Sequence, residues 1–277
     1  MIISSVTELQ HWYTQVYERN NKEWFDFEAI IQSVYEALLH EGDVAIDGGA
    51  HVGRHSIPMA RRVGPTGAVF AFEPISEVVR SFRQHIDTHC ADLKSVIRLQ
   101  ELAISDYSGK AEFLVAEDPG YSGLRERIYP REMPLNRRQV VVDRLDVLCR
   151  GVGPVRFIKL DLEGGEYHAM KGGWEILKQQ RPVVVFEYDR FHTPRFYGYE
   201  HADLLGLFQE LDFRVMDVIG TPFDSPSIWD GATLWYYFAV PREAGLDHTI
   251  SQAIEHCIQS WAPWYKLPEG RSTGLKF

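Results

Sequence analysis

Acidic residues close several apolar segments of this sequence, and glycines follow the first of them. "VAIDGGAHVG" runs from an apolar stretch into Asp47 and then through Gly48, Gly49 and Gly53. "VFAFEP" is a second apolar stretch, and it ends at Glu73. Glycine loops between a strand and a helix bind nucleotides, because the main chain can approach the ligand closely there. The spacing of the glycines and the position of the acids indicate which nucleotide.

The glycine spacing differs from that of diphosphate-binding loops. From Gly48 the sequence reads G-G-A-H-V-G, whereas dinucleotide-binding folds use G-x-G-x-x-G. The carboxylate of Asp47 opposes a diphosphate and suits a ligand with an ammonium group. S-adenosylmethionine has an ammonium group, a sulfonium cation and no phosphate. Glu73 can accept hydrogen bonds from both hydroxyls of its ribose. Two plain alternatives remain: a nicotinamide-dependent oxidoreductase, and acids that only favour nearby helix N-termini.

A third acidic segment, "FIKLDLEGGE", ends an apolar stretch at Asp161 and Glu163. The predicted topology places this strand beside the first, so Asp161 is expected to face the reactive end of the cofactor. Two carboxylates also suit Mg²⁺. Alternate residues of a strand point to opposite faces, however, so both cannot easily reach one ion unless the strand ends between them. We therefore predict no metal site.

The elements that position these acids alternate along the chain. Strands are predicted at 43–47, 68–73, 95–102, 155–161 and 182–188, and helices at 54–63, 76–90, 167–179 and 201–211. Such alternation predicts right-handed βαβ units, with helices on both faces of a mostly parallel, seven-stranded sheet. "FRVMDVIG" and "ATLWYYFAV" are joined only by a loop and predict an antiparallel pair at one edge. Residues 109–116 and 138–143 predict two further strands.

The ends of the chain read as helical additions to this α/β core. Helices are predicted at 6–18, 24–39 and 247–260. The predicted division is an N-terminal helical segment (1–41), an α/β domain that would hold the nucleotide site (42–240) and a C-terminal helical tail (241–277).

Composition indicates an ordinary globular protein of 277 residues with a formal net charge of −10. That charge argues against binding to nucleic acid or to an anionic membrane. No apolar run approaches the length of a membrane span. Three widely spaced cysteines predict free thiols in a reducing compartment, so a cytoplasmic location is expected. A homodimer is compatible with the sequence.

The segments "IDGGAHVGRHS", "VFAFEP", "LAISDYSG", "VVVDRLDVL", "FIKLDLEGGEYHAMKGG" and "PVVVFEY" together resemble the FkbM-type methyltransferases of the class I, S-adenosylmethionine-dependent fold. The segments occur in the family's order and cover roughly residues 42–190. The sequence departs from the family pattern at Gly48, where a small aliphatic residue is more usual, and at His51, where many relatives carry a small amide residue. The resemblance implies an O-methyltransferase, often acting on a sugar, a peptide or another natural product. A non-catalytic cofactor-binding module on the same fold is the remaining alternative.

The resemblance also implies which residues contact the cofactor. The glycine loop is expected around the methionine moiety, Glu73 on the ribose, and the stretch 101–103 beside the adenine. The full expected set is Asp47, Gly48, Gly49, His51, Gly53, Glu73, Pro74, Glu101, Ala103 and Asp161.

Methyl transfer to a hydroxyl needs a general base, whereas a carboxylate acceptor is already ionised and needs none. The predicted catalytic residues are His192, His55 and Asp161. His51 and His168 also follow strand ends, so they stay open as weaker candidates.

An arginine-rich insertion at about 117–138 is the expected acceptor-binding part of the chain. Within it, the glycine-punctuated stretch 119–124 precedes the arginine-rich residues 125–138 and predicts a mobile lid. Guanidinium groups pair with carboxylate or phosphate, so an anionic group on the acceptor is expected. A solvated basic loop is the plain alternative. The predicted acceptor-binding residues are Tyr121, Arg125, Arg127, Arg131 and Arg138.

Overall fold

The computed structural model describes residues 26–129, 132–189, 193–223 and 235–261. The predicted helix at 6–18, the predicted base His192 and the predicted acceptor contact Arg131 lie outside these residues.

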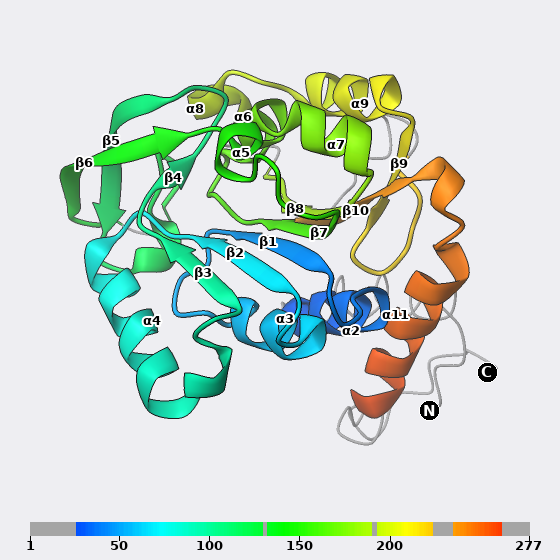
Figure 1. Cartoon of the computed structure of the whole chain (residues 1–277). Helices are drawn as coiled ribbons and strands as arrows, with labels where there is room; N and C mark the ends of the chain where they lie inside the picture. Colours follow the sequence, from blue (N-terminus) through cyan, green and yellow to red (C-terminus); the bar gives the residue numbers. More distant parts are fainter. Residues whose placement is uncertain (1–25, 130–131, 190–192, 224–234, 262–277) are drawn as a thin grey trace, which may run out of the picture.

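A seven-stranded sheet forms the centre of the molecule (Figure 1). Its strand order is β3-β2-β1-β7-β8-β10-β9. The strands are β1 (Val44–Gly48), β2 (Ala68–Phe72), β3 (Ile97–Gln100), β7 (Val155–Leu160), β8 (Val183–Glu187), β9 (Phe213–Asp217) and β10 (Tyr236–Pro241). The first five in spatial order run parallel, and β10 runs antiparallel to both of its neighbours. The predicted antiparallel pair at one edge is therefore confirmed; β9 is the outermost strand and β10 the reversed one.

The chain lays down strands outward from β1 to β3 and then returns to place β7 on the other side of β1. The order reverses between β1 and β7, and the carboxyl ends of strands at such a reversal form the ligand-binding crevice of open α/β sheets. Asp47 in β1 and Asp161, directly after β7, are thereby brought to the same edge of the sheet.

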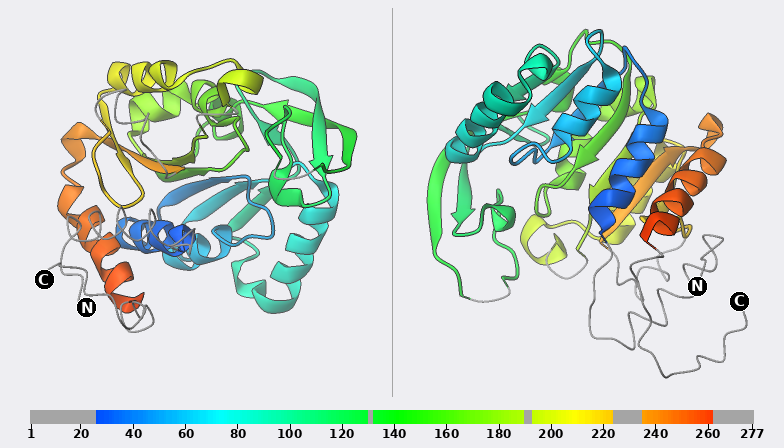
Figure 2. Two further views of the ribbon diagram at one scale, coloured as in Figure 1. Left: turned by 180° about the vertical axis from the view of Figure 1, so that it is seen from behind. Right: turned by 90° about the horizontal axis from the view of Figure 1, so that it is seen from below.

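Helices cover both faces of the sheet, and each face has its own apolar core (Figures 1 and 2). One face carries α2 (Phe27–Leu38), α3 (Ser56–Val63), α4 (Ser76–His89) and α11 (Asp247–Trp261). The other carries α5 (Leu145–Leu148), α6 (Glu166–Gly172), α7 (Trp174–Gln180) and α9 (His201–Glu210). The remaining described helical elements are the short α8 (Thr193–Tyr197) and the 3-10 turns η1 (Ala91–Leu93), η2 (Pro119–Tyr121) and η3 (Arg242–Ala244).

The single helix predicted over 167–179 is wrong, because the chain forms two helices, α6 and α7, that meet at Gly173. At the end of α6, Gly172 lies against the main chain of Ser105, where an added Cβ would come within 2.0 Å of the carbonyl oxygen. This close approach requires a glycine, and glycine weakens a helix interior.

A second, smaller sheet stands beside the first. It consists of β4 (Ala103–Ile104), β5 (Gly109–Ala116) and β6 (Leu135–Asp143) in the order β4-β6-β5. The strand predicted over 95–102 is shorter than expected, and the chain passes from β3 into β4 of this second sheet. The two further predicted strands correspond to β5 and β6.

Helices from opposite ends of the chain pair beneath the main sheet, as the two views of Figure 2 show. Asp26 caps α2 by accepting a hydrogen bond from the Ala29 amide at 3.0 Å. The Ser33 hydroxyl donates to the carbonyl of Ala253 in α11 at 2.8 Å. Both helices belong to the same core cluster as the sheet. The threefold division of the chain predicted from the sequence stays a prediction.

None of the described helices is long and apolar enough to cross a membrane. The three cysteines are buried and free, as predicted.

If α2 is an integral part of this core, shortening one of its buried side chains destabilises the whole domain. Ile31 is fully buried, so Ile31→Ala is expected to lower the free energy of unfolding by about 3 kcal/mol. Urea unfolding followed by circular dichroism measures the change. Glu36→Ala, at an exposed position of the same helix, serves as the control and should change it by under about 0.5 kcal/mol. Equal stability of the two variants would contradict the integral role of α2.

Candidate active site

The glycine loop after β1 packs directly on the end of β7. Gly49 has a φ of +74°, and a Cβ at this residue would lie 1.9 Å from the carbonyl oxygen of Asp161. Gly53 has a φ of +88° and lies against the ring of Phe82. Both positions require glycine, because a side chain would meet the main chain in one case and a buried ring in the other. The loop is thus fixed by two of its predicted residues.

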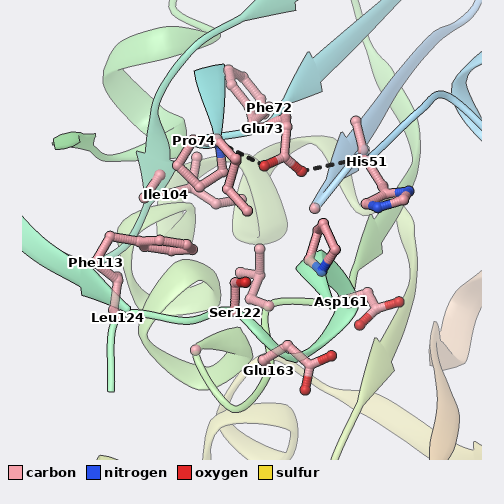
Figure 3. A pocket seen from close by; sticks show the side chains of 18 of the residues that line it. His51, Phe72, Glu73, Pro74, Ile104, Phe113, Ser122, Leu124, Asp161 and Glu163 are labelled. Carbon is pink, nitrogen blue, oxygen red and sulfur yellow. Dashed lines mark hydrogen bonds between the residues drawn. The ribbon is translucent and has the colours of Figure 1, made fainter. Parts of the chain in front are cut away.

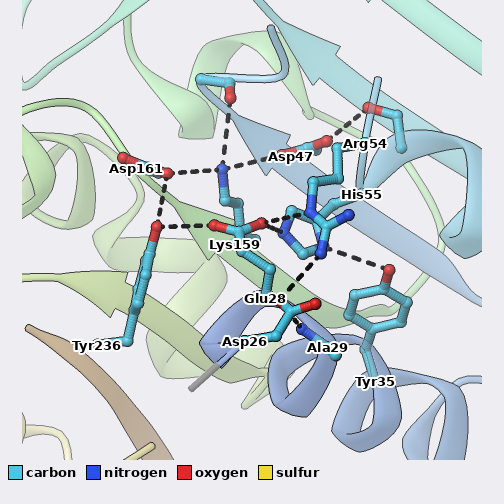
Figure 4. Close-up of polar contacts among 12 residues, drawn as sticks. Asp26, Glu28, Ala29, Tyr35, Asp47, Arg54, His55, Lys159, Asp161 and Tyr236 are labelled. Atoms are coloured by element: carbon cyan, nitrogen blue, oxygen red, sulfur yellow. Dashed lines mark hydrogen bonds and ion pairs between the residues drawn. The ribbon is translucent and has the colours of Figure 1, made fainter. Parts of the chain in front are cut away.

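A buried lysine links the two acids at this edge of the sheet (Figure 4). The Nζ atom of Lys159 lies 3.2 Å from Oδ2 of Asp161 and 3.8 Å from Oδ1 of Asp47, and it donates to the Gly49 carbonyl at 3.4 Å. Burial favours the neutral amine, but the two carboxylates outweigh it and raise the pKa of Lys159 above its ordinary value. Lys159 is a site residue that the sequence analysis missed, although its place two residues before Asp161 was a usable signal.

Asp47 supports the loop from below. Its carboxylate is fully buried and accepts a hydrogen bond from the Ser56 hydroxyl at 2.5 Å. It does not line the cavity that lies at the carboxyl ends of β1, β2 and β7. Gly48 and Gly53 also lie outside the cavity lining. At Gly48, an added Cβ would come within 2.7 Å of the Ile104 side chain, so the departure from the family pattern suits the local packing. Direct contacts from these three residues to a cofactor stay a prediction.

A cavity of about 330 Å³ lies at the carboxyl ends of β1, β2 and β7 (Figure 3). One end is apolar, and the other is lined by the glycine loop and charged side chains. The apolar end consists of Phe72, Pro74, Ile75, Leu102, Ala103, Ile104, Phe113 and Leu124. Six of the predicted cofactor contacts line the cavity, namely Gly49, His51, Glu73, Pro74, Ala103 and Asp161. Glu101 does not: it is exposed and accepts a hydrogen bond from Ser76.

Glu73 lies between the two ends of the cavity and is oriented by the main chain. Its Oε2 accepts from the amide of His51 at 3.1 Å, and its Oε1 accepts from the amide of Ile75 at 2.9 Å. Burial raises the pKa of Glu73 to about 7, although the two N–H donors favour the charged form. The carboxylate is therefore held in one orientation and titrates near neutral pH.

Glu28 of α2 also lines the cavity, and the sequence analysis missed it. Its Oε2 accepts from Nε of Arg54 at 2.9 Å and lies 2.5 Å from Nε2 of His55. Its Oε1 accepts from the hydroxyl of Tyr236 at 3.0 Å. Burial alone would raise the pKa of Glu28, but hydrogen bonds from His55 and Arg54 lower it below its ordinary value. No sequence signal joins α2 to this site, because the contacts bridge distant parts of the chain.

The predicted base His55 has both ring nitrogens engaged (Figure 4). Nε2 faces Glu28, and Nδ1 lies 3.3 Å from the hydroxyl of Tyr35. A catalytic role for His55 stays a prediction. In this structure both of its ring nitrogens already have partners, so neither is available to take a proton from a methyl acceptor. The hydroxyl of Tyr236 lies 3.0 Å from Oδ2 of Asp161 as well as 3.0 Å from Glu28, so its single proton serves one carboxylate at a time.

Asp161 and Glu163 turn toward the same place because β7 ends at Leu160, before either of them. Glu163 has a φ of +56°, and one carboxylate oxygen from each of Asp161, Glu163 and Glu187 lies within 4.8 Å of the others. The strand-alternation reasoning against a shared ion does not apply here. A divalent cation would fit such a set, but Lys159 and Arg127 already pair with two of its members. We assign no metal to it.

The insertion covers the cavity with its first part. Pro119, Gly120, Ser122 and Leu124 line the cavity wall. The guanidinium group of Arg127 pairs with Glu163 and lies 4.9 Å from the ring centre of Tyr121.

The other predicted acceptor-binding arginines lie apart from Arg127. Arg138 pairs with Glu77 on α4 at 2.5 Å. Arg125 is exposed and lines a second cavity of about 570 Å³. His168 lines this second cavity and not the first, and burial lowers its pKa.

The strand order, the glycine loop and the oriented carboxylate after β2 define a Rossmann-like methyltransferase fold. Residues 47–215, more than half of the chain, match the model of the methyltransferase FkbM domain. The chain belongs to this family of methyltransferases, and its methyl donor is S-adenosylmethionine. The resemblance seen in the sequence is therefore confirmed.

Solved structures with a similar arrangement include several methyltransferases. Methyltransferase FkbM from Methylobacillus flagellatus is 14% identical with a TM-score of 0.43, over 84% of this chain and 59% of that chain. A SAM-dependent O-methyltransferase from Thermotoga maritima is 16% identical with a TM-score of 0.43, over 86% and 71%. A protein from Streptococcus mutans in complex with SAH is 12% identical with a TM-score of 0.44, over 78% and 98%. No curated protein sequence matches the chain.

The Lys159 ammonium is expected to hold the two acids and the glycine loop together. Lys159→Met leaves Asp47 and Asp161 without their buried cation and should lower the free energy of unfolding by about 3–5 kcal/mol. Adding Asp47→Asn removes one of the uncompensated charges, so the double variant should regain part of that stability. Denaturant unfolding of the wild type and the two variants measures both effects. A double variant less stable than Lys159→Met would contradict this charge compensation.

Proposed function

We propose that this protein transfers a methyl group from S-adenosylmethionine to an oxygen atom, a hydroxyl or a carboxylate, of a small-molecule or peptide acceptor. The observation that carries the proposal is the cavity at the ends of β1, β2 and β7, which has an apolar end, an oriented carboxylate in the middle and charged groups at the other end. These three parts suit an adenine, a ribose diol and an amino-acid moiety in that order.

The apolar end of the cavity would hold the adenine, with Ala103 and Pro74 among its walls. Glu73 would accept hydrogen bonds from the two ribose hydroxyls, since its own orientation is fixed by the amides of His51 and Ile75. The methionine moiety would then lie along the glycine loop, next to Asp161.

The bound cofactor supplies an electrophilic methyl group. Asp161 is the base that the geometry favours, because it lines the cavity and is partly exposed there. Lys159 and Tyr236 both contact its Oδ2, and Glu187 also shares a hydrogen bond with this carboxylate. A carboxylate has about four acceptor positions, so one that remains would take the proton of an acceptor hydroxyl. Holding the acceptor oxygen in line with the methyl group supplies much of the remaining acceleration.

The insertion would shape the acceptor site. Its first part closes over the cavity, and the contact of Arg127 with Glu163 holds it there. Arg125 is exposed beside the second cavity, so it remains available to an anionic group of the acceptor. Tyr121 and Arg127 support each other and would act through the shape of this segment. A cytoplasmic location and a homodimer stay predictions.

Binding of S-adenosylhomocysteine is expected to weaken as the pH falls, because the diol prefers the ionised form of Glu73. The pKa of Glu73 is raised to about 7, so the proton competes with the ligand below that pH. Affinity at pH 6 should be up to about tenfold lower than at pH 8. Calorimetric titrations across this range measure the change.

Glu73→Gln cannot ionise and should bind weakly with little dependence on pH. Glu41→Gln, at an exposed carboxylate, is the matched control and should behave like the wild type. A Glu73→Gln variant that keeps the wild-type affinity and slope would place the ribose elsewhere.

Asp161→Asn is expected to separate the two classes of acceptor. With hydroxyl acceptors the variant loses the base, and kcat should fall by about 10²-fold to 10⁴-fold. With carboxylate acceptors the nucleophile is already ionised, and kcat should change much less. Transfer of label from methyl-labelled S-adenosylmethionine to a panel of sugars, phenols and carboxylic acids measures both. Full activity of the variant on a hydroxyl acceptor would rule out Asp161 as the base.

A further inference from the structure

The methionine moiety of the cofactor ends in a carboxylate, and this end of the cavity must provide it with donors. Most main-chain donors of the glycine loop are already used inside the protein. The amides of Gly49 and Ala50 both donate to the carbonyl of Phe72 at 3.0 Å, and that of Gly53 donates to Ala50 at 2.8 Å. The amide of His51 donates to Glu73. A side chain is therefore the better candidate for the carboxylate.

Among the residues that line the cavity, one lysine and one arginine carry a positive charge, namely Lys159 and Arg54. Lys159 is only 5% exposed at its side chain, and it is already surrounded by Asp47, Asp161 and the Gly49 carbonyl. Arg54 is half exposed and lies in the loop that leads into α3. Arg54 is thus the cation that a ligand can reach.

The guanidinium group of Arg54 is held along one side by α2. Its Nε donates to Glu28 at 2.9 Å, and its Nη2 donates to Asp26 at 3.3 Å. Nη1 has no acceptor in the part of the chain that the structure describes. The group is therefore oriented by two carboxylates and keeps donors for a third.

We propose that Arg54 binds the carboxylate of the methionine moiety of S-adenosylmethionine, and that Asp26 and Glu28 position its guanidinium group for this contact. The inference rests on the cofactor orientation of the proposed function. It extends the cofactor site to α2, which precedes the residues 47–215 that match the family model.

Charge at this end of the cavity suits a zwitterion. Arg54 can pair with the carboxylate of the ligand, while the carboxylates of Asp161 and Glu28 line the same end and can face its ammonium group. An amino-acid moiety satisfies both signs, and an adenosine derivative without one leaves both unused.

Arg54→Gln tests the contact by comparing two ligands. S-adenosylhomocysteine carries the amino-acid moiety, whereas 5′-methylthioadenosine lacks it. Loss of a charge-assisted contact should weaken S-adenosylhomocysteine about tenfold or more and leave 5′-methylthioadenosine unchanged in calorimetric titrations. Arg83→Gln, at an exposed position of α4, is the charge-matched control and should match the wild type for both ligands.

Decarboxylated S-adenosylmethionine isolates the carboxylate itself. The wild type should bind it about tenfold or more weaker than S-adenosylmethionine, and Arg54→Gln should bind the two with similar affinity. Equal weakening of all ligands by Arg54→Gln, or unchanged binding of S-adenosylhomocysteine, would overturn the proposal. Failure of the proposed cofactor orientation would be seen in a different variant. 5′-Methylthioadenosine keeps the ribose, so if the ribose does not lie on Glu73, Glu73→Gln leaves the binding of this ligand unchanged.

Glu28→Gln tests the positioning role. Removing a negative charge beside Arg54 should by charge alone tighten the binding of a carboxylate. If Glu28 orients the guanidinium group, S-adenosylhomocysteine instead weakens by about fivefold while 5′-methylthioadenosine does not. Glu36→Gln, exposed on the same helix, is the control. Unchanged or tighter binding of S-adenosylhomocysteine by Glu28→Gln would show that Glu28 does not position Arg54.

Discussion

The ammonium group of Lys159 is the interaction on which the site depends. It is buried between Asp47 in β1 and Asp161 after β7, at the point where the strand order reverses. Two carboxylates in this position would repel each other without a cation, and a lone buried cation would be costly as well. The three groups together fix the ends of two strands and, through the Gly49 carbonyl, the loop between them. In this protein, the buried ion pairs of Lys159 with Asp47 and Asp161 form the floor of the crevice that is common to open α/β sheets.

Parts of the chain outside the family region complete the site. Glu28 of α2 lines the charged end of the cavity, and the hydroxyl of Tyr236 in β10 contacts Glu28 from outside the cavity lining. Their contacts reach Arg54 and His55 on the loop and Asp161 on the acidic segment. A methyltransferase core can thus keep its adenine and ribose contacts while the flanking elements set the environment of the reacting end.

Local patterns were sufficient to predict the sheet, the glycine loop and the position of Glu73 at a strand end. Each of these depends on the order of apolar, glycine and acidic residues within a short segment of the chain. They were not sufficient for Glu28, which reaches the site only through the packing of α2 beneath the sheet. The place of Asp47 at the end of a strand was also predictable, but its burial against Ser56 and Lys159 depends on tertiary packing. The break between α6 and α7 escaped for a similar reason, because it depends on the contact of Gly172 with Ser105. Sequence spacing gives the edge of a sheet on which a residue lies, and tertiary packing decides whether its side chain meets a ligand.

The internal hydrogen bonds of the glycine loop have a thermodynamic consequence for the cofactor. Gly49, Ala50, His51 and Gly53 have their amides bound to Phe72, Glu73 and the loop itself before any ligand arrives. The conformational entropy of this loop is therefore lost during folding and is not lost again during association. A loop ordered in advance changes little between the free and bound protein, so substrate exchange between turnovers would rest on the segments around the loop.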